Sequence, residues 1–151
     1  MKQKYDDNFL QVEASNSVDQ LNARFYGNFP YPWPPMKFVT LTDPYFETTM
    51  LNQNLGYWED SVIPKNPKIW VAGCGTNQAV ITALKFPEAT VLGSDISTKS
   101  LDICSNTSTK LGISNLELKE ESLNKITYKE KFDYIISTGV IHHNANPEAP
   151  F

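Results

Sequence analysis

The segment Ile69-Trp70-Val71-Ala72-Gly73-Cys74-Gly75-Thr76 joins a short apolar run to a turn that contains two glycines. The apolar run predicts a buried β-strand, and the glycines allow the backbone to turn sharply and to approach a ligand closely. Residues 77–86 continue with a helical pattern. A helix there would direct the unpaired N–H groups of its first turn toward a carboxylate or a phosphate. A Gly-x-Gly turn also occurs as a tight strand-to-helix connection without a ligand, and that alternative stays open.

Strands and helices alternate along the rest of the second half of the chain. Short apolar runs predict strands at residues 90–94, 116–119 and 132–137, and a helical pattern from 97 to 111 lies between the first two. Strands separated by helices of this length imply right-handed parallel crossovers. We therefore expect an α/β fold, with a Rossmann-like, open and mainly parallel sheet in a half-domain at residues 67–151.

The N-terminal segment, residues 1–66, is rich in aromatic residues, proline and amides. Residues 4–27 predict a mostly helical stretch, and Asp43-Pro44 predicts the start of another helix that ends near Leu55. The prolines between residues 29 and 35 exclude a helix there. The aromatic side chains from Phe25 to Trp33 could form a lid over an acceptor, but core and helix packing is the interpretation that we favour. We expect the two segments to form one compact unit.

Composition and charge exclude several classes of protein. The chain has 151 residues, a net charge of −4 and a pI of about 5.1, which suits one acidic globular unit without a nucleic-acid partner. Cys74 and Cys104 do not form a CxxC pair, so we expect reduced thiols and no metal site. Residues 1–10 are polar and no apolar run has the length of a membrane span. We therefore expect a cytoplasmic protein without a membrane partner.

Acidic residues follow two of the predicted strands. Ligands of open parallel sheets bind beyond the carboxyl ends of the strands, where such side chains gather. Asp95 stands 22 residues after Gly73, a distance at which a carboxylate accepts hydrogen bonds from ribose hydroxyls. The alternative is that Asp95 caps the next helix. After the third strand, Glu121 is favoured over Glu120 as an acceptor for the amino group of adenine, and the alternative is a solvated pair of charges.

The glycine pattern distinguishes two classes of nucleotide ligand. A dinucleotide-binding turn has the sequence G-x-G-x-x-G, in which the third glycine allows close packing of the helix. That position is Gln78 in this chain, which disfavours a nicotinamide dinucleotide and an oxidoreductase. An adenosyl ligand without a pyrophosphate needs only the first part of the turn.

Three segments resemble motifs of the class I S-adenosylmethionine (SAM)-dependent methyltransferases. Residues 69–76 resemble motif I, and Gly93-Ser94-Asp95-Ile96-Ser97 resembles the acidic motif that follows it. Residues 132–143, which end in Gly139-Val140-Ile141-His142-His143, resemble the motif at the fourth strand. The resemblance implies methyl transfer from SAM to an acceptor, with S-adenosylhomocysteine (SAH) as the product. The acceptor is not implied.

A narrower resemblance covers most of residues 24–151. The chain is similar to bacterial methyltransferase domains found beside tetratricopeptide repeats. Those domains combine a Pro-Tyr-Pro segment, an Ala-Gly-Cys-Gly-Thr turn, an Asp-x-Ser followed by Ser-Leu, and Gly-Val-Leu-His-His. The counterparts here are Pro30-Tyr31-Pro32, residues 72–76, Asp95-Ile96-Ser97 with Ser100-Leu101, and residues 139–143.

The resemblance assigns expected roles to residues at the strand ends. Motif I and the fourth-strand motif would hold the methionine part of SAM, Asp95 the ribose, and Ile96 and the residues after the third strand the adenine. His142 and His143 are candidate catalytic bases, with structural packing and solvation as the alternative. The expected cofactor-binding residues are Ala72, Gly73, Cys74, Gly75, Thr76, Asp95, Ile96, Glu121, Ser122, Ser137, Thr138 and Gly139.

Two departures from the family pattern lead to further expectations. Asn77 stands where the family often has glycine, and SAM binding should survive because Asn tolerates unusual backbone angles. The family continues beyond the fourth strand, whereas this sequence stops at Phe151, so the chain is expected to be truncated or a fragment. The fourth strand, a neighbour of the first in the family, would then lie at an exposed edge. A second copy, a separate chain or the N-terminal segment would cover that edge. The runner-up function is a noncatalytic SAM- or SAH-binding module, or a half-enzyme that needs a partner chain.

Overall fold

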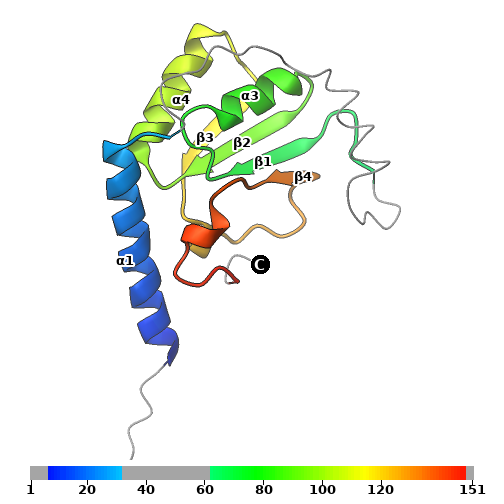
Figure 1. The fold of residues 1–151 in the computed structure, drawn as a ribbon. Helices are drawn as coiled ribbons and strands as arrows, with labels where there is room; N and C mark the ends of the chain where they lie inside the picture. The colour runs from blue at the N-terminus through cyan, green and yellow to red at the C-terminus, as the bar shows by residue number, and fades with distance from the viewer. Residues whose placement is uncertain (1–6, 32–61, 149–151) are drawn as a thin grey trace, which may run out of the picture.

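The computed structural model describes residues 7–31 and 62–148. One long helix precedes a unit of alternating strands and helices (Figure 1). The elements are α1 (Asp7–Asn28), β1 (Lys68–Ala72), α3 (Gln78–Lys85), β2 (Thr90–Asp95), α4 (Thr98–Lys110), β3 (Leu116–Glu120), the 3-10 turn η1 (Leu123–Lys125), β4 (Tyr134–Ile136) and the 3-10 turn η2 (Ile141–His143). The helix predicted from Asp43 to Leu55 lies outside the described residues.

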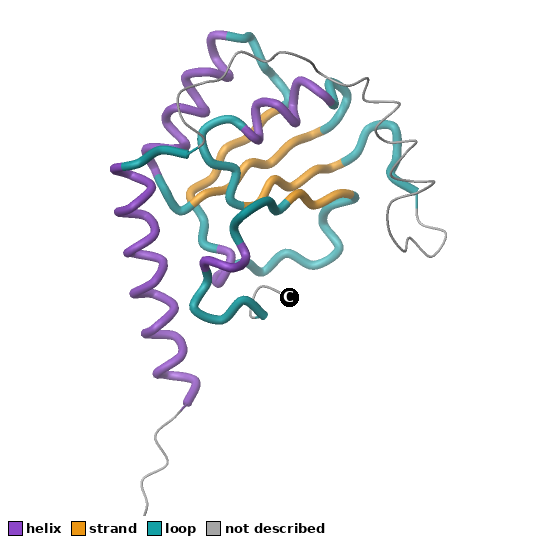
Figure 2. Tube along the Cα trace, viewed as in Figure 1, coloured by secondary structure: helices purple, strands orange, loops and turns teal. Residues whose placement is uncertain are grey.

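The four described strands form one parallel sheet in the order β3-β2-β1-β4 (Figure 2). Ile69 of β1 lies opposite Val91 of β2 on one side and opposite Tyr134 of β4 on the other. The two inner strands, β1 and β2, are therefore the most buried. The expectation of an open, parallel, Rossmann-like α/β fold is confirmed, as is the pairing of the first and fourth strands.

Strand β4 is shorter than the predicted 132–137. Only Tyr134 to Ile136 pair with β1. Asp133 instead closes the start of the strand with two hydrogen bonds. Its backbone N–H donates to the carbonyl of Lys68, and its carboxylate accepts from the N–H of Lys68 at 2.7 Å. Strand β4 lies at the edge of the described sheet, and its apolar residue Ile135 is 53% exposed there.

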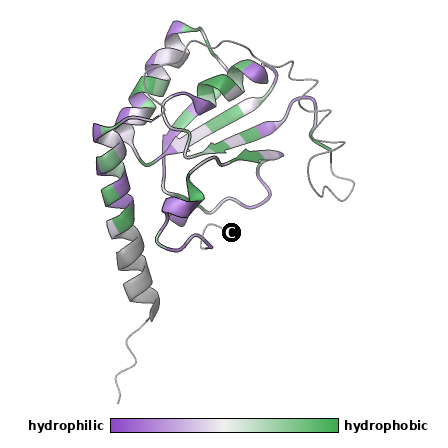
Figure 3. Cartoon of the chain, in the orientation of Figure 1, coloured by the Kyte–Doolittle hydropathy of each residue, from purple (hydrophilic) through white to green (hydrophobic). Residues whose placement is uncertain are grey.

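Helices α3 and α4 lie on the same side of the sheet (Figure 1). They cover the face formed by alternate residues of the inner strands, because side chains of a strand point to opposite faces in turn. Figure 3 shows hydrophobic residues in the sheet and in α3. The buried cluster on this side consists of Ile69, Val71, Cys74, Ala79, Val80, Ala83, Phe86, Ala89, Val91, Leu101 and Cys104. Both cysteines in it are free thiols, as expected.

The opposite face of the sheet is covered by the segment between β3 and β4. Trp70 stacks on Phe132 with ring centroids 5.6 Å apart, and Tyr128 meets Trp70 edge-on at 5.4 Å. Because a buried indole N–H needs a partner, Trp70 Nε1 donates to the hydroxyl of Ser94 at 2.8 Å. Phe132 is thus part of a second small core rather than of a strand, which explains why the predicted strand was too long.

Helix α1 packs against α4 and lies beside η2, to which it is hydrogen-bonded. Two of its side chains, Leu21 and Phe25, and two just after it, Phe29 and Tyr31, are more than half exposed. Among the helices of the described ranges, none combines the length and the apolar character that crossing a bilayer requires.

Replacing Gly93 with alanine is expected to destabilise the fold. A Cβ at Gly93 would meet the Cβ of Ala79 at 2.6 Å and a methyl group of Leu118 at 2.9 Å, where α3 and β3 meet β2. Overpacking of this kind costs about 1–3 kcal/mol. Urea denaturation of Gly93→Ala measures the loss, with Gly27→Ala as the control. A Cβ at Gly27 meets nothing within 4 Å, so that variant should be neutral or slightly stabilised, and equal losses in both variants would contradict this packing.

Candidate functional site

A cavity of about 820 Å³ lies at the carboxyl ends of the strands. Six parts of the chain line it: α1 with the residues just after it, the turn after β1, the end of β2 with the residue after it, the first turn of α4, the segment after β3, and the segment after β4. Of the residues expected from the sequence, it brings together Gly73, Gly75, Asp95, Ile96, Glu121, Ser122, Thr138, Gly139, His142 and His143. Ala72, Cys74 and Thr76 are buried and do not line the cavity, and neither does Ser137, whose hydroxyl is buried without a partner among the described residues.

The turn after β1 requires glycine at its first position. Gly73 has a φ of +68°, which residues with a side chain rarely adopt. A Cβ on Gly73 would also meet the side chain of Val140 at 2.3 Å. The segment after β4 therefore packs directly on the turn, and the backbone of Gly73 forms part of the cavity wall.

The amide groups of this turn already have partners within the protein. The N–H of Cys74 donates to the carbonyl of Ser94 at 2.9 Å, and that of Gln78 donates to the carbonyl of Cys74 at 3.2 Å. The N–H of Thr76 donates to the carbonyl of Tyr31, which follows α1, at 3.1 Å. Of the first-turn N–H groups of α3 that were expected to face an anion, that of Gln78 is therefore already paired. The acceptors of the Cys74 and Thr76 amides come from other segments, so the sequence could not reveal them.

Asp95 connects the turn to the end of β2. One carboxylate oxygen accepts from the N–H of Gly75 at 2.9 Å, and the other accepts from the N–H of Ser97 at 2.9 Å. Burial raises the pKa of the Asp95 carboxyl above its ordinary value, while the bonds from Ser97 and Gly75 act in the opposite direction. The backbone of Ile96 also bonds to the carboxylate, so three of its roughly four acceptor sites are used and capacity remains for a ligand hydroxyl. The cap of α4 is Ser97, whose hydroxyl accepts from the N–H of Ser100, so Asp95 is not the capping residue.

Asn77 does not use the conformational freedom for which glycine would be needed. Its φ is −148°, in a range open to residues with side chains. The substitution of Asn for the family's glycine is therefore compatible with this backbone. The next residue, Gln78, donates from its side chain to the hydroxyl of Thr138 at 3.0 Å, so it bridges α3 to the segment after β4.

Glu121 is held by an ion pair and a phenol at the edge of the cavity. Lys119 Nζ lies 2.6 Å from one of its oxygens, and the hydroxyl of Tyr128 donates to the other at 2.7 Å. The hydrogen bonds to Glu121 and Tyr128 raise the pKa of Lys119. Glu121 is therefore not a freely solvated charge. Glu120 lies apart from the cavity lining and accepts from the hydroxyl of Thr98 at 3.3 Å.

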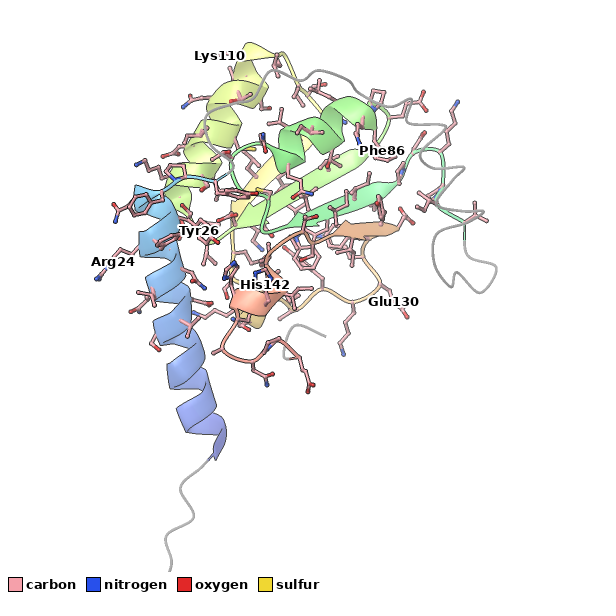
Figure 4. The ribbon with its side chains drawn as sticks, in the orientation of Figure 1. Arg24, Tyr26, Phe86, Lys110, Glu130 and His142 are labelled. Carbon is pink, nitrogen blue, oxygen red and sulfur yellow. The ribbon has the colours of Figure 1, made fainter. Side chains whose placement is uncertain are left out.

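Helix α1 forms one wall of the cavity through polar side chains. Asp19 accepts hydrogen bonds from the hydroxyl of Ser122 and from the side-chain amide of Asn124. Asn22 and Tyr26 both bond to His143. Positions 19, 22 and 26 share one face of a helix. Figure 4 shows Tyr26 on α1 near the turn that carries His142. The sequence analysis missed this wall, and the only signal was the spacing of three polar residues.

The aromatic residues after the middle of α1 also line the cavity. Phe25 is 54%, Phe29 60% and Tyr31 66% exposed. The favoured interpretation is wrong where it places these three side chains in the core, although Phe25 and Phe29 do pack on each other, with ring centroids 5.3 Å apart. They instead form an aromatic rim at the cavity, whereas Trp33 lies outside the described residues. The lining also contains Ser100 and Val140, which belong to segments that resemble the family motifs, and Leu123 and Asn144, which the sequence did not single out.

The comparisons with known proteins agree on one family. A family model described as a methyltransferase domain matches residues 66–151, which is more than half of the chain. The structure of PKMT2 from Rickettsia typhi in complex with AdoHcy is 28% identical, with a TM-score of 0.53, and the match covers 73% of this chain and 21% of that chain. A SAM dependent methyltransferase from Aquifex aeolicus has 16% identity and a TM-score of 0.52, over 83% of this chain and 61% of that chain.

The chain therefore spans less than two thirds of the length of these two structures, and about a fifth of the first. The likeness to the Aquifex aeolicus protein bears on the fold alone, and it agrees with the open parallel sheet. The match at residues 66–151 contains the whole sheet, the glycine turn and Asp95. On this evidence the chain belongs to the methyltransferase-domain family of class I, Rossmann-like proteins.

Proposed function

We propose that this chain binds SAM in the cavity at the strand ends and takes part in methyl transfer to an acceptor that remains to be identified. The observation that carries the proposal is the pairing of Asp95 with the glycine turn. A carboxylate with spare acceptor capacity lines the cavity beside the glycine backbone of the turn, to which it is hydrogen-bonded. This arrangement suits a ligand that offers vicinal hydroxyls and needs close approach of the backbone.

The charge of the cavity supports an adenosyl ligand over a dinucleotide. Its described lining contains three carboxylates, those of Asp19, Asp95 and Glu121, and no lysine or arginine. A pyrophosphate would meet negative charge there, and the turn amides that could bind it already donate within the protein. A sulfonium cation and neutral hydroxyls are compatible with the same lining. Gln78, which stands where a dinucleotide-binding turn has its third glycine, disfavours a dinucleotide as well.

Different residues of the chain would contact the ribose, the adenine and the methionine part of SAM. Asp95 would accept from the ribose hydroxyls, Ile96 would pack on the adenine, and Glu121 and Ser122 would lie at its edge. Gly73, Gly75 and the segment of Thr138 and Gly139 would contact the methionine part. When bound, SAM supplies a methyl group on a sulfonium that is already activated for displacement. The protein then contributes position, orientation and exclusion of water.

A noncatalytic SAM- or SAH-binding module, or a half-enzyme that needs a partner chain, is the second candidate. It is favoured by the exposure of Ile135 at the β4 edge, since an open apolar edge invites pairing with another chain. Truncation, a partner chain, a cytoplasmic location and association with tetratricopeptide repeats stay predictions, as do the boundary near residue 66 and the roles given to individual residues.

Calorimetry is expected to show binding of SAM and SAH and none of NAD. Asp95→Ala should weaken SAH binding roughly tenfold to a hundredfold, because charge-assisted hydrogen bonds worth about 1.5–3 kcal/mol are lost. Asp102→Ala is the matched control, since Asp102 is an exposed aspartate of α4 outside the cavity lining, and it should bind like the parent chain. A thermal melt of each variant checks the fold. Absence of binding by SAM and SAH would exclude both candidate functions.

The affinity for SAH is expected to fall as the pH is lowered from neutral. Only the ionised carboxylate of Asp95 accepts bonds from the amides and the ligand together, and its pKa lies above the ordinary value because of burial. The loss should therefore begin at a higher pH than for an exposed aspartate. The stability of the unliganded chain should change in the opposite direction. A carboxyl group whose pKa is raised in the folded state lowers the free energy of unfolding as the pH rises through that pKa. Calorimetry at several pH values measures the effect, and Asp95→Ala should lack it.

Self-association through the β4 edge is the expected outcome of solution scattering at high concentration. Ile135→Lys places a charge on the open edge and should shift the chain toward the monomer. Leu111→Lys changes another exposed apolar residue, just after α4, and should leave the association unchanged. A monomeric parent chain at all concentrations would argue against a second copy as the covering partner.

A further inference from the structure

Helix α1 lies outside residues 66–151, the part matched by the methyltransferase-domain model, yet it supplies one wall of the cavity. The cavity also contains the two histidines of the chain, His142 and His143, which sequence alone leaves equivalent. The contacts of α1 distinguish between them.

His143 is fixed from three directions. Its Nε2 lies 3.2 Å from the hydroxyl of Tyr26, and the two rings meet edge-on with centroids 6.0 Å apart. Its carbonyl accepts a hydrogen bond from the side-chain amide of Asn22 at 3.0 Å. Its N–H donates to the carbonyl of Val140 at 3.0 Å, within the turn η2. Both the backbone and the imidazole of His143 are therefore held in place.

His142 is held much less. Its ring lies 4.0 Å from that of His143 at an angle of 41°. Within the described ranges its imidazole makes no hydrogen bond, so the two histidines, which are both exposed, differ in their hydrogen bonds. A base must present a defined nitrogen in a defined direction, and a partner on the other nitrogen provides this. His143 meets that requirement and His142 does not.

We propose that Tyr26 is a positioning residue that holds Nε2 of His143 and leaves Nδ1 of that ring as the nitrogen that accepts a proton in the cavity. This inference rests on the proposed function. As the acceptor heteroatom gains the methyl group, its bond to hydrogen breaks and the proton moves to Nδ1. The electron pair of the broken carbon–sulfur bond stays on sulfur, so the step balances.

The Tyr26 hydroxyl is suited to this role because it stays protonated. Burial and the negative charge of Asp95 raise its pKa above the ordinary value. The contact therefore joins a neutral phenol to the ring, and if the phenol oxygen accepts from Nε2–H, as the proposed role of Tyr26 requires, Nδ1 carries no proton. Asn22, by contrast, hydrogen-bonds to the backbone carbonyl of His143 and not to its ring. Variants of Tyr26 and Asn22 can therefore distinguish positioning of the His143 ring from attachment of α1 to η2.

NMR of the full chain tests the inference without requiring an acceptor. The ¹⁵N shifts of the imidazole report which nitrogen carries the proton, and ring relaxation reports an order parameter. His142→Asn assigns the signals, because it leaves His143 as the only histidine. The parent chain should show His143 as the Nε2–H tautomer with an order parameter near the rigid value of about 0.85. Tyr26→Phe should lower the order parameter below about 0.6 and mix the tautomers.

Asn22→Ala is the matched control, since it also removes one bond between α1 and His143. It should leave the tautomer and order parameter of His143 unchanged. A mobile or Nδ1–H ring in the parent chain, no change in Tyr26→Phe, or an equal change in Asn22→Ala would overturn the inference. Calorimetry with SAH separates the two proposals. Binding of SAH with a mobile His143 ring refutes only the role of Tyr26, whereas a fixed ring without SAM or SAH binding refutes the proposed function.

Discussion

The carboxylate of Asp95 is the constraint on which the site depends. It ends one inner strand and bonds to the amide of Gly75 in the turn after the other. Through Ser97 it also fixes the start of the loop that leads into α4. A buried carboxylate is tolerated only when hydrogen bonds compensate its lost hydration, and here backbone amides provide them. The backbone of the turn and the charge beside it therefore hold each other in place.

A second set of polar contacts joins α1 to this centre. The core of the sheet is apolar and well packed, whereas the cavity side of α1 is attached through Asp19, Asn22 and Tyr26. Hydrogen bonds exchanged with water contribute little net stability each, so α1 depends on several of them acting together. The same contacts fix the orientation of α1 at the cavity, because hydrogen bonds are directional and apolar contacts are not. The two parts of the chain thus contribute different kinds of interaction to one cavity.

Much of the fold could be predicted from local patterns, and the errors have physical causes. Buried runs and helical spacing indicated β1, α3, β2 and α4 because each pattern reports burial by its own segment. Phe132 was assigned to a strand because apolar character does not tell which of two cores a side chain enters. For the site, strand ends correctly indicated where Asp95 and Glu121 meet a cavity. Lys119 is only two residues from Glu121, but Tyr128 and the acceptors of the Cys74 and Thr76 amides come from other segments, which sequence spacing does not reveal.

The hydrogen bond from the N–H of Thr76 to the carbonyl of Tyr31 has a consequence for how the family unit is defined. It attaches the backbone just after α1 to the glycine turn of the ligand site. Tyr31 lies outside the matched range, which begins at residue 66, and Thr76 lies inside it. The matched domain and the stretch of chain that lines the site therefore differ in length. Residues between Asp19 and Tyr31 line the cavity from outside the matched range, so changes there can alter which molecule the cavity admits and leave the motifs of residues 66–151 intact.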